Sequence, residues 1–204
     1  MLKVVDLAVA RGGVAVLEGV NFDVTTGKAV ILRGDNGSGK TTLLRTIAGL
    51  QEPLAGHIEV APDSIAYAAH LDGIKANLTV AENLSFWAEV FQSDQMDHAV
   101  EAFDLGDLLA RPASTLSAGQ KRRLGLSRLL VTGRDIWVLD EPTVSLDAFT
   151  VKNFAEIVKT HLAKGGAALI ATHVELGLEG ETLDVMQFKA TGATGLSSFD
   201  EGFL

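Results

Sequence analysis

A glycine-rich segment, Gly34-Asp-Asn-Gly-Ser-Gly-Lys-Thr41, has the residue types that bind nucleotide phosphates. The apolar run 29–33 before it suits a buried parallel strand, and the apolar residues after Thr41 have helical spacing. Glycines let successive N–H groups converge on phosphate oxygens, and the helix N-terminus adds a positive dipole end. A plain glycine-rich turn is the alternative, but the strand, loop and helix around Lys-Thr favour a phosphate site. The expected nucleotide contacts are Gly34, Asp35, Asn36, Gly37, Ser38, Gly39, Lys40, Thr41 and Thr42.

Polar residues near this loop and after the apolar run 136–139 indicate Mg²⁺-dependent hydrolysis of a nucleotide. Lys40 is expected to reach the β and γ phosphates, and the Thr41 hydroxyl to ligate Mg²⁺. Asp140 ends a predicted strand, where ligands gather in open α/β sheets, and is the second expected Mg²⁺ ligand. Glu141 is the candidate to orient or deprotonate the attacking water. Two acids that merely close a strand and start a turn are the alternative interpretation.

A third segment, Leu116-Ser-Ala-Gly-Gln120, precedes a helix rich in basic and apolar residues. Small residues at a helix N-terminus form an anion site in their own right. An ordinary Ser N-cap is the alternative, and it explains Ser117 but not the Gly119-Gln120 pair after it. A histidine, His173, follows the apolar run 167–171, and by default such a residue is a satisfied surface or core side chain.

In this order and at these separations, the segments resemble those of ATP-binding subunits of ABC transporters over essentially the whole chain. The resemblance implies that Ser117, Gly119 and Gln120 contact ATP held by a second copy, so that two copies form an ATP-sandwich homodimer. It also implies that Asp147, in Thr143-Val-Ser-Leu-Asp147, lies at the dimer contact. His173 then matches the switch histidine, which senses the γ phosphate and supports the water held by Glu141.

Two positions depart from the family pattern. The glutamine that links the ATP site to the membrane subunit is absent, and by position after the strand 64–68 the candidate is His70. A solvated loop histidine is the alternative. The loop Ala10 to Val14 lacks the usual aromatic that stacks on adenine, and Arg11 is the candidate to stack its guanidinium there, or is simply solvated. Selectivity for ATP over GTP is therefore left open.

A narrower resemblance is to the haem exporter ATPases of cytochrome c maturation. It rests on His in place of the linking Gln, on His70-Leu-Asp-Gly-Ile-Lys75, on the segment 77–84 and on the opening residues. It implies multispanning membrane partner subunits, an indirect link to a periplasmic haem chaperone, and a peripheral position on the cytoplasmic face of the inner membrane. The five histidines lack the spacing of a haem site.

Composition limits the classes of function. The 204 residues, 47% of them hydrophobic, suffice for one domain with a real core. No apolar run approaches the roughly 18–20 residues that cross a bilayer, and the N-terminal residues lack the basic, apolar and small-residue order that is expected of a signal peptide. The lack of Cys fits a cytoplasmic protein. The net charge of −9 argues against nucleic acid as a partner, because such binding depends on Lys and Arg.

The order of patterns predicts an α/β fold with a phosphate-loop NTPase core, a mostly parallel sheet and an N-terminal antiparallel sheet. The antiparallel sheet is expected to include strands at 2–9 and 20–24. From about 79 to 130 the spacing is helical, which predicts an inserted helical lobe. The chain is thus expected to be one domain, 1–204, with a core lobe of about 1–78 and 131–204.

Three alternative functions share some of these motifs. An ABC ATPase for another exported substrate would have the same motifs and different membrane partners. A soluble ABC ATPase with a regulatory role would have no membrane partner, and the segment from Thr79 to Leu84 argues against it. A nucleotide kinase or GTPase that shares only the phosphate loop has no need of Leu116 to Gln120.

Overall fold

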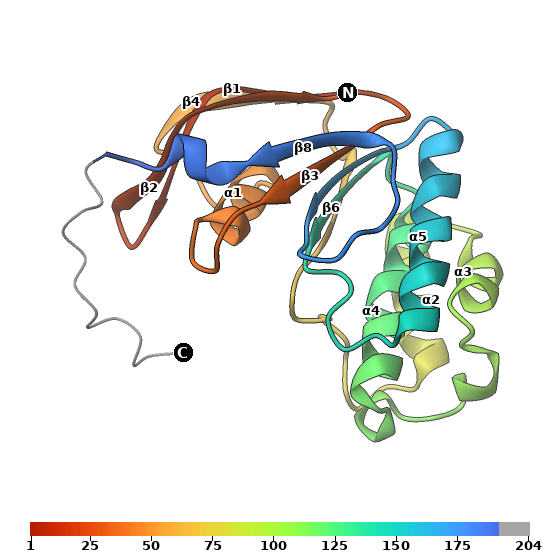
Figure 1. Cartoon of the computed structure of the whole chain (residues 1–204). Helices are drawn as coiled ribbons and strands as arrows, with labels where there is room; N and C mark the ends of the chain where they lie inside the picture. The colour runs from red at the N-terminus through yellow and green to blue at the C-terminus, as the bar shows by residue number, and fades with distance from the viewer. Residues whose placement is uncertain (192–204) are drawn as a thin grey trace.

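Two β-sheets support the phosphate loop in the computed structural model, which describes residues 1–191 (Figure 1). The smaller sheet is antiparallel and consists, in spatial order, of β2 (Val14–Val24), β1 (Leu2–Arg11) and β4 (Ala55–Val60). The larger sheet is parallel and consists, in spatial order, of β5 (Ile65–Ala68), β6 (Ile136–Asp140), β7 (Ala167–Ala171), β3 (Ala29–Arg33) and β8 (Gly180–Asp184). The predicted α/β class with its two kinds of sheet is confirmed.

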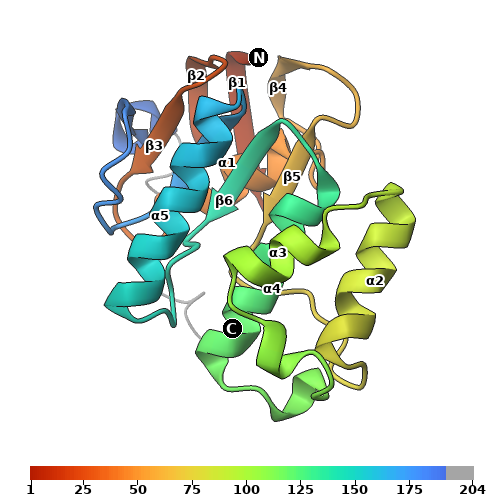
Figure 2. The same ribbon diagram turned by 90° about the vertical axis from the view of Figure 1, so that its right-hand side faces the viewer.

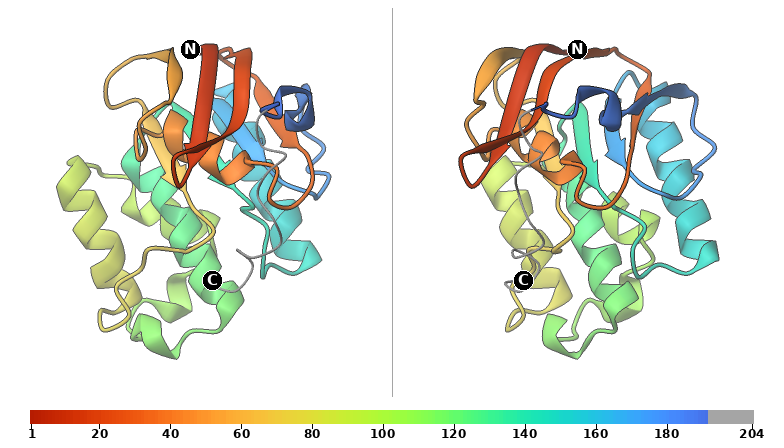
Figure 3. Two further views of the ribbon diagram at one scale, coloured as in Figure 1. Left: turned by 90° about the vertical axis from the view of Figure 1, so that its left-hand side faces the viewer. Right: turned by 60° about the vertical axis from the view of Figure 1, so that its left-hand side comes forward.

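Helix α1 (Lys40–Ile47) lies between the two sheets, under the β1–β2 hairpin (Figure 3). Its apolar side chains Leu43, Leu44 and Ile47 are at most 2% exposed and pack with residues of both sheets in one apolar cluster. Burial of this kind stabilises a fold by about 1.5–3 kcal/mol for each large apolar side chain. The helix that follows the phosphate loop is therefore fixed on two sides.

The other face of the parallel sheet is covered by helices (Figure 2). Helices α4 (Ala118–Thr132) and α5 (Ala148–Ala163) lie on the sheet, and α2 (Val80–Phe91) and α3 (Met96–Ala102) pack on α4. Short 3₁₀ turns occupy Gly106–Leu108, Ala113–Thr115 and Val185–Phe188. A second apolar cluster joins these helices to the sheet and includes the fully buried Trp137 and Phe154.

Helices α2, α3 and α4 are inserted between the neighbouring strands β5 and β6, as the predicted helical lobe requires. The exact division at residues 78/79 and 130/131 stays a prediction. Helix α4 continues to Thr132, past the predicted boundary. Residues 192–204, which the predicted core lobe includes, lie outside the described residues.

The predicted ends of the first two strands were wrong, because β1 extends to Arg11 and β2 begins at Val14 rather than at 20. The expected loop 10–14 is mostly strand: Ala10 and Arg11 belong to β1, and only Gly12 and Gly13 form the turn, with φ of +57° and +83°. Two consecutive residues with positive φ match the right-handed twist of a tight hairpin. Thr79 and Glu82 form a capping box with reciprocal bonds of 3.1 and 2.7 Å, which starts α2 at Val80. None of the helices described between residues 1 and 191 combines the length and apolar character needed to cross a membrane.

The stacked pair His161 and Trp137 makes fold stability sensitive to acid. The two rings are 3.8 Å apart and 8° from parallel, and burial lowers the pKa of His161 below its ordinary value of 6.5. The unfolded chain therefore binds a proton here more readily than the folded one, so stability present above pH about 6.5 is lost as the pH falls below it. We expect His161→Phe, which keeps a stacked ring but binds no proton, to lose less stability on acidification. Thermal unfolding from about pH 8 to 5 checks this, and equal losses in both proteins would contradict it.

Candidate nucleotide-binding and hydrolysis site

The phosphate loop joins β3 to α1, and two of its glycines are required by close contacts. Gly34 has φ +147°, and a Cβ there would lie 2.7 Å from Val185 Cγ2 and 2.9 Å from Ser38 Oγ. Gly39, the N-cap of α1, has φ +99°, and its Cβ would lie 3.1 Å from Leu17 Cγ. Because other residues rarely adopt these conformations and a side chain would collide here, the loop can fold tightly only with glycine.

Lys40 lies inside the curve of the loop. The residue is 7% exposed, and its Nζ donates to the carbonyls of Gly34 at 2.7 Å and Asp35 at 2.9 Å. The first turn of α1 carries no acidic residue, and its N-cap Gly39 has no side chain to occupy the amides there. The Ser38 hydroxyl is buried and has no hydrogen-bond partner among the described residues. The loop thus offers a buried cation and free donors, which is the donor set that phosphates require.

A cavity of about 490 Å³ opens over this loop. It brings together the predicted residues Arg11, Asp140 and Glu141 with the phosphate loop, and three basic side chains face two carboxylates in it. Three lining residues were missed by the sequence interpretation. The complete lining is Arg11, Val16, Asn36, Gly37, Ser38, Gly39, Lys40, Thr41, Thr42, Arg45, Gln51, Asp140 and Glu141.

The missed residues are Val16, Arg45 and Gln51. Arg45 lies on α1 beyond the motif, so helical spacing from Thr41 is the one signal that could have indicated it. Val16 and Gln51 come from β2 and from the segment after α1, and the Gln51 amide donates to the carbonyl of Ala10. Nothing local to either residue in the sequence connects it with a phosphate loop.

The acidic pair and the histidine meet where two adjacent parallel strands end. β6 and β7 are paired up to Asp140 and Ala171, and the Glu141 amide donates to the Ala171 carbonyl at 2.8 Å. This turn gives Glu141 a φ of +45° and leaves its carboxylate Oε1 3.4 Å from His173 Nε2. The predicted proximity of Glu141 and His173 is therefore present in the structure. Their catalytic roles stay a prediction.

Asp140 is suited to hold a cation. It is 3% exposed, and together with burial its charge raises the pKa of Tyr67 on β5 to about 12. Asp140 and Thr41 line the same cavity. Among residues 1–191 there is no group of three acidic, His or Cys side chains that could hold a metal alone.

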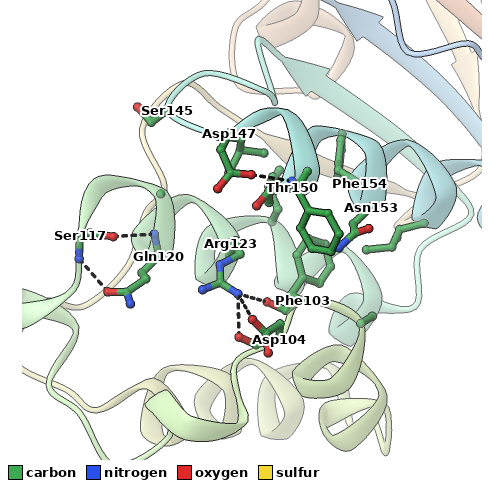
Figure 4. Close-up of a pocket in the computed structure, with 16 residues that line it drawn as sticks. Phe103, Asp104, Ser117, Gln120, Arg123, Ser145, Asp147, Thr150, Asn153 and Phe154 are labelled. Atoms are coloured by element: carbon green, nitrogen blue, oxygen red, sulfur yellow. Dashed lines mark hydrogen bonds and ion pairs between the residues drawn. The ribbon is translucent and has the colours of Figure 1, made fainter.

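A second cavity, of about 650 Å³, lies between the N-termini of α4 and α5 (Figure 4). Ser117 caps α4, and its amide and hydroxyl exchange bonds of 2.9 and 3.3 Å with Gln120. The prediction that a cap does not explain Gln120 was therefore wrong, because Gln120 completes a capping box. On the opposite wall Asp147 caps α5, and the Thr150 amide, which donates to it at 2.8 Å, lowers the pKa of its carboxyl.

The two cavities share none of the lining residues described in this chain. Ser117, Gly119, Gln120 and Asp147 are thus gathered together, but not around the phosphate loop of their own chain. His70 lines neither cavity, and it lies exposed in the loop after β5. Its linking role stays a prediction.

Known proteins resemble this chain over nearly its full length. The model of the family described as ABC transporter matches residues 17–144. A cytochrome c biogenesis ATP-binding export protein CcmA from Ruegeria pomeroyi is 64% identical over 192 residues, which cover 94% of each chain. A protein of the same name from Roseobacter denitrificans is 60% identical and covers 100% of this chain and 99% of its own. The structure of an ABC transporter ATP-binding protein from Pyrococcus furiosus, 26% identical, covers 93% of this chain and 99% of its own with a TM-score of 0.83.

Proposed function

Because this chain belongs to the ATP-binding proteins of the ABC transporter family, and within them to the CcmA proteins, we propose that it drives haem export in cytochrome c biogenesis as an ATP-hydrolysing subunit. The observation that carries this proposal is the 64% identity to a cytochrome c biogenesis export protein over 94% of both chains. The phosphate cavity supports the ATPase part, since a buried Lys40 and an acidic pair face one space. Haem itself need not touch this subunit.

The chemistry that we propose is hydrolysis of the terminal phosphate of ATP. Lys40 and the loop amides bind the β and γ phosphates, and Glu141 accepts a proton from water as the water oxygen bonds to the γ phosphorus. The bond from that phosphorus to the bridging oxygen breaks, which gives ADP and phosphate. His173, 3.4 Å from Glu141, holds the carboxylate and contacts the γ phosphate. Thr41 and Asp140 would hold Mg²⁺, which when bound neutralises charge that develops on the phosphate oxygens.

The complete site is proposed to need two copies of the chain. The cavity that holds Ser117 and Asp147 is separate from the phosphate cavity, which supports contact between the Ser117 side and ATP held by a second copy. ATP then joins the two subunits, and loss of its γ phosphate lets them separate. That motion is passed to multispanning membrane subunits. The protein binds these subunits peripherally, on the cytoplasmic face of the inner membrane. A periplasmic haem chaperone is linked only indirectly.

We expect affinity purification of the tagged protein from detergent-solubilised membranes to recover multispanning subunits and a haem-bearing chaperone. Mass spectrometry and a haem absorbance scan identify them. A matched test is a strain that lacks the chain: its c-type cytochromes should lose covalent haem, and the wild-type chain but not Glu141→Gln should restore it. Recovery of other membrane proteins, together with normal c-type cytochromes, would contradict the proposed role in haem export but would leave the proposed ATPase activity standing. Recovery of no membrane protein would favour a soluble role.

A further inference from the structure

We propose that Arg122 is a positioning residue for ATP hydrolysis, which fixes the backbone of Glu141 and ties it to the exposed loop 69–72. The proposal rests on the proposed function in one respect, namely that Glu141 acts on the attacking water. Arg122 lies in the first turns of α4, two residues after the segment that ends at Gln120, and its side chain is 4% exposed. It lines neither of the two cavities, so it does not itself contact ATP.

One side of the Arg122 guanidinium holds the turn that carries the acidic pair. Nη2 donates to the carbonyl of Glu141 at 2.8 Å and to that of Asp140 at 3.4 Å, and Nε donates to the carbonyl of Pro142 at 2.9 Å. Three consecutive carbonyls are thus bound by one side chain. Glu141 needs such support because its φ of +45° is uncommon for a residue with a side chain.

The other side of the guanidinium holds the loop after β5. Nη1 donates to the carbonyls of Ala69 at 2.8 Å and His70 at 3.3 Å, and it forms an ion pair with Asp72 Oδ1 at 2.9 Å. This loop is at the surface, where the side chain of Leu71 is 79% exposed. A shift of the loop therefore moves the carbonyls that hold Arg122, and through Arg122 it moves the turn of Glu141.

The contact is also tightly packed, so movement of one part is passed on to the other. One turn further along α4, a Cβ on Gly125 would lie 2.8 Å from the Cβ of Asp72. The planar guanidinium presents donors in fixed directions, whereas a Lys ammonium offers a single point of attachment. Lys in place of Arg122 can keep the ion pair with Asp72 but cannot reach both loops. The link between the loops thus depends on arginine and not only on positive charge.

The test is the steady-state ATPase of the detergent-purified complex with Arg122→Lys. We expect kcat to fall about 10- to 100-fold, since a catalytic group misplaced by about 1 Å costs about 10²-fold, while KM for ATP changes less than about threefold. The control Arg134→Lys alters a partly buried arginine that pairs with Asp63 at 3.5 Å outside both cavities, and should keep wild-type kcat. A wild-type kcat in Arg122→Lys would overturn the proposal.

A second variant separates positioning from general loss of folding. In Arg122→Ala, guanidinium ion at millimolar concentration should restore part of kcat, and methylammonium at the same concentration should not. Failure of guanidinium to restore kcat in a variant that still binds ATP would overturn the positioning role. Wild type and Glu141→Gln are measured alongside: if wild type has no ATPase, or Glu141→Gln keeps it, the proposed function fails. If those two behave as expected and Arg122→Lys is normal, only the present inference fails.

Discussion

Glu141→Gln is expected to abolish ATP hydrolysis and leave ATP binding intact. The substitution keeps the size of the side chain and its place 3.4 Å from His173, but the amide cannot accept a proton from water. Loss of a general base lowers a rate by about 10²–10⁴-fold. Lys40 and the loop amides, which bind the phosphates, are unchanged, so ATP should stay bound and hold two copies together.

Two measurements check this expectation. Phosphate release should fall to background, and with ATP and Mg²⁺ the variant should elute as a dimer while wild type with ADP does not. Glu179→Gln is the matched control, because Glu179 is a 93% exposed carboxylate whose partner is the surface Lys28. Normal phosphate release by Glu141→Gln would show that Glu141 is not the base that accepts a proton from the attacking water. Loss of ATP binding would mean instead that the carboxylate holds the nucleotide.

The phosphate loop could be predicted from the sequence because its signals are local. Glycines, Lys40 and Thr41 follow an apolar strand and precede a helix, and this order alone determines where their backbone amides point. The meeting of Glu141 and His173 was implied by the family resemblance. Its physical basis is that Glu141 directly follows β6 and His173 lies two residues after β7, and neighbouring parallel strands end at one edge of the sheet.

What the sequence did not indicate depends on long-range contacts. The partners of Arg122 are 18 to 20 residues away on one side and 50 to 53 on the other, so no spacing marks it among the basic residues of α4. The position of Arg11 depends on a two-glycine hairpin that extends β1, and the sequence interpretation placed a longer loop there. Gln120 is the opposite case: its capping bond to the Ser117 amide is local, like that of Glu82 to the Thr79 amide, so the spacing of Ser117 and Gln120 alone could have predicted it.

The shared site leads to a second large effect, in mixed dimers. Lys40→Ala removes the buried cation of the phosphate loop, and loss of one such group costs about 10²–10³-fold. Ser117→Asp puts a negative charge where the γ phosphate of the partner's ATP is expected. Asp is as good an N-cap as Ser, so α4 keeps its cap. Ser117→Asn, neutral and also a good cap, is the matched variant and should be less impaired than Ser117→Asp.

The activity of a mixed dimer depends on whether the two substitutions lie in different subunits or in the same subunit. The two possible arrangements of the site predict opposite activities for these two dimers. If each site combines Lys40 of one copy with Ser117 of the other, a dimer of Lys40→Ala with Ser117→Asp keeps one intact site and about half the wild-type activity at most. A dimer of the double mutant with wild type then has no intact site. If each site lay within one chain, the first dimer would be inactive and the second about half active. Differently tagged subunits are purified through both tags and assayed for phosphate release. The result decides whether this enzyme has its active sites between its two copies, which is the arrangement that the separation of the two cavities favours.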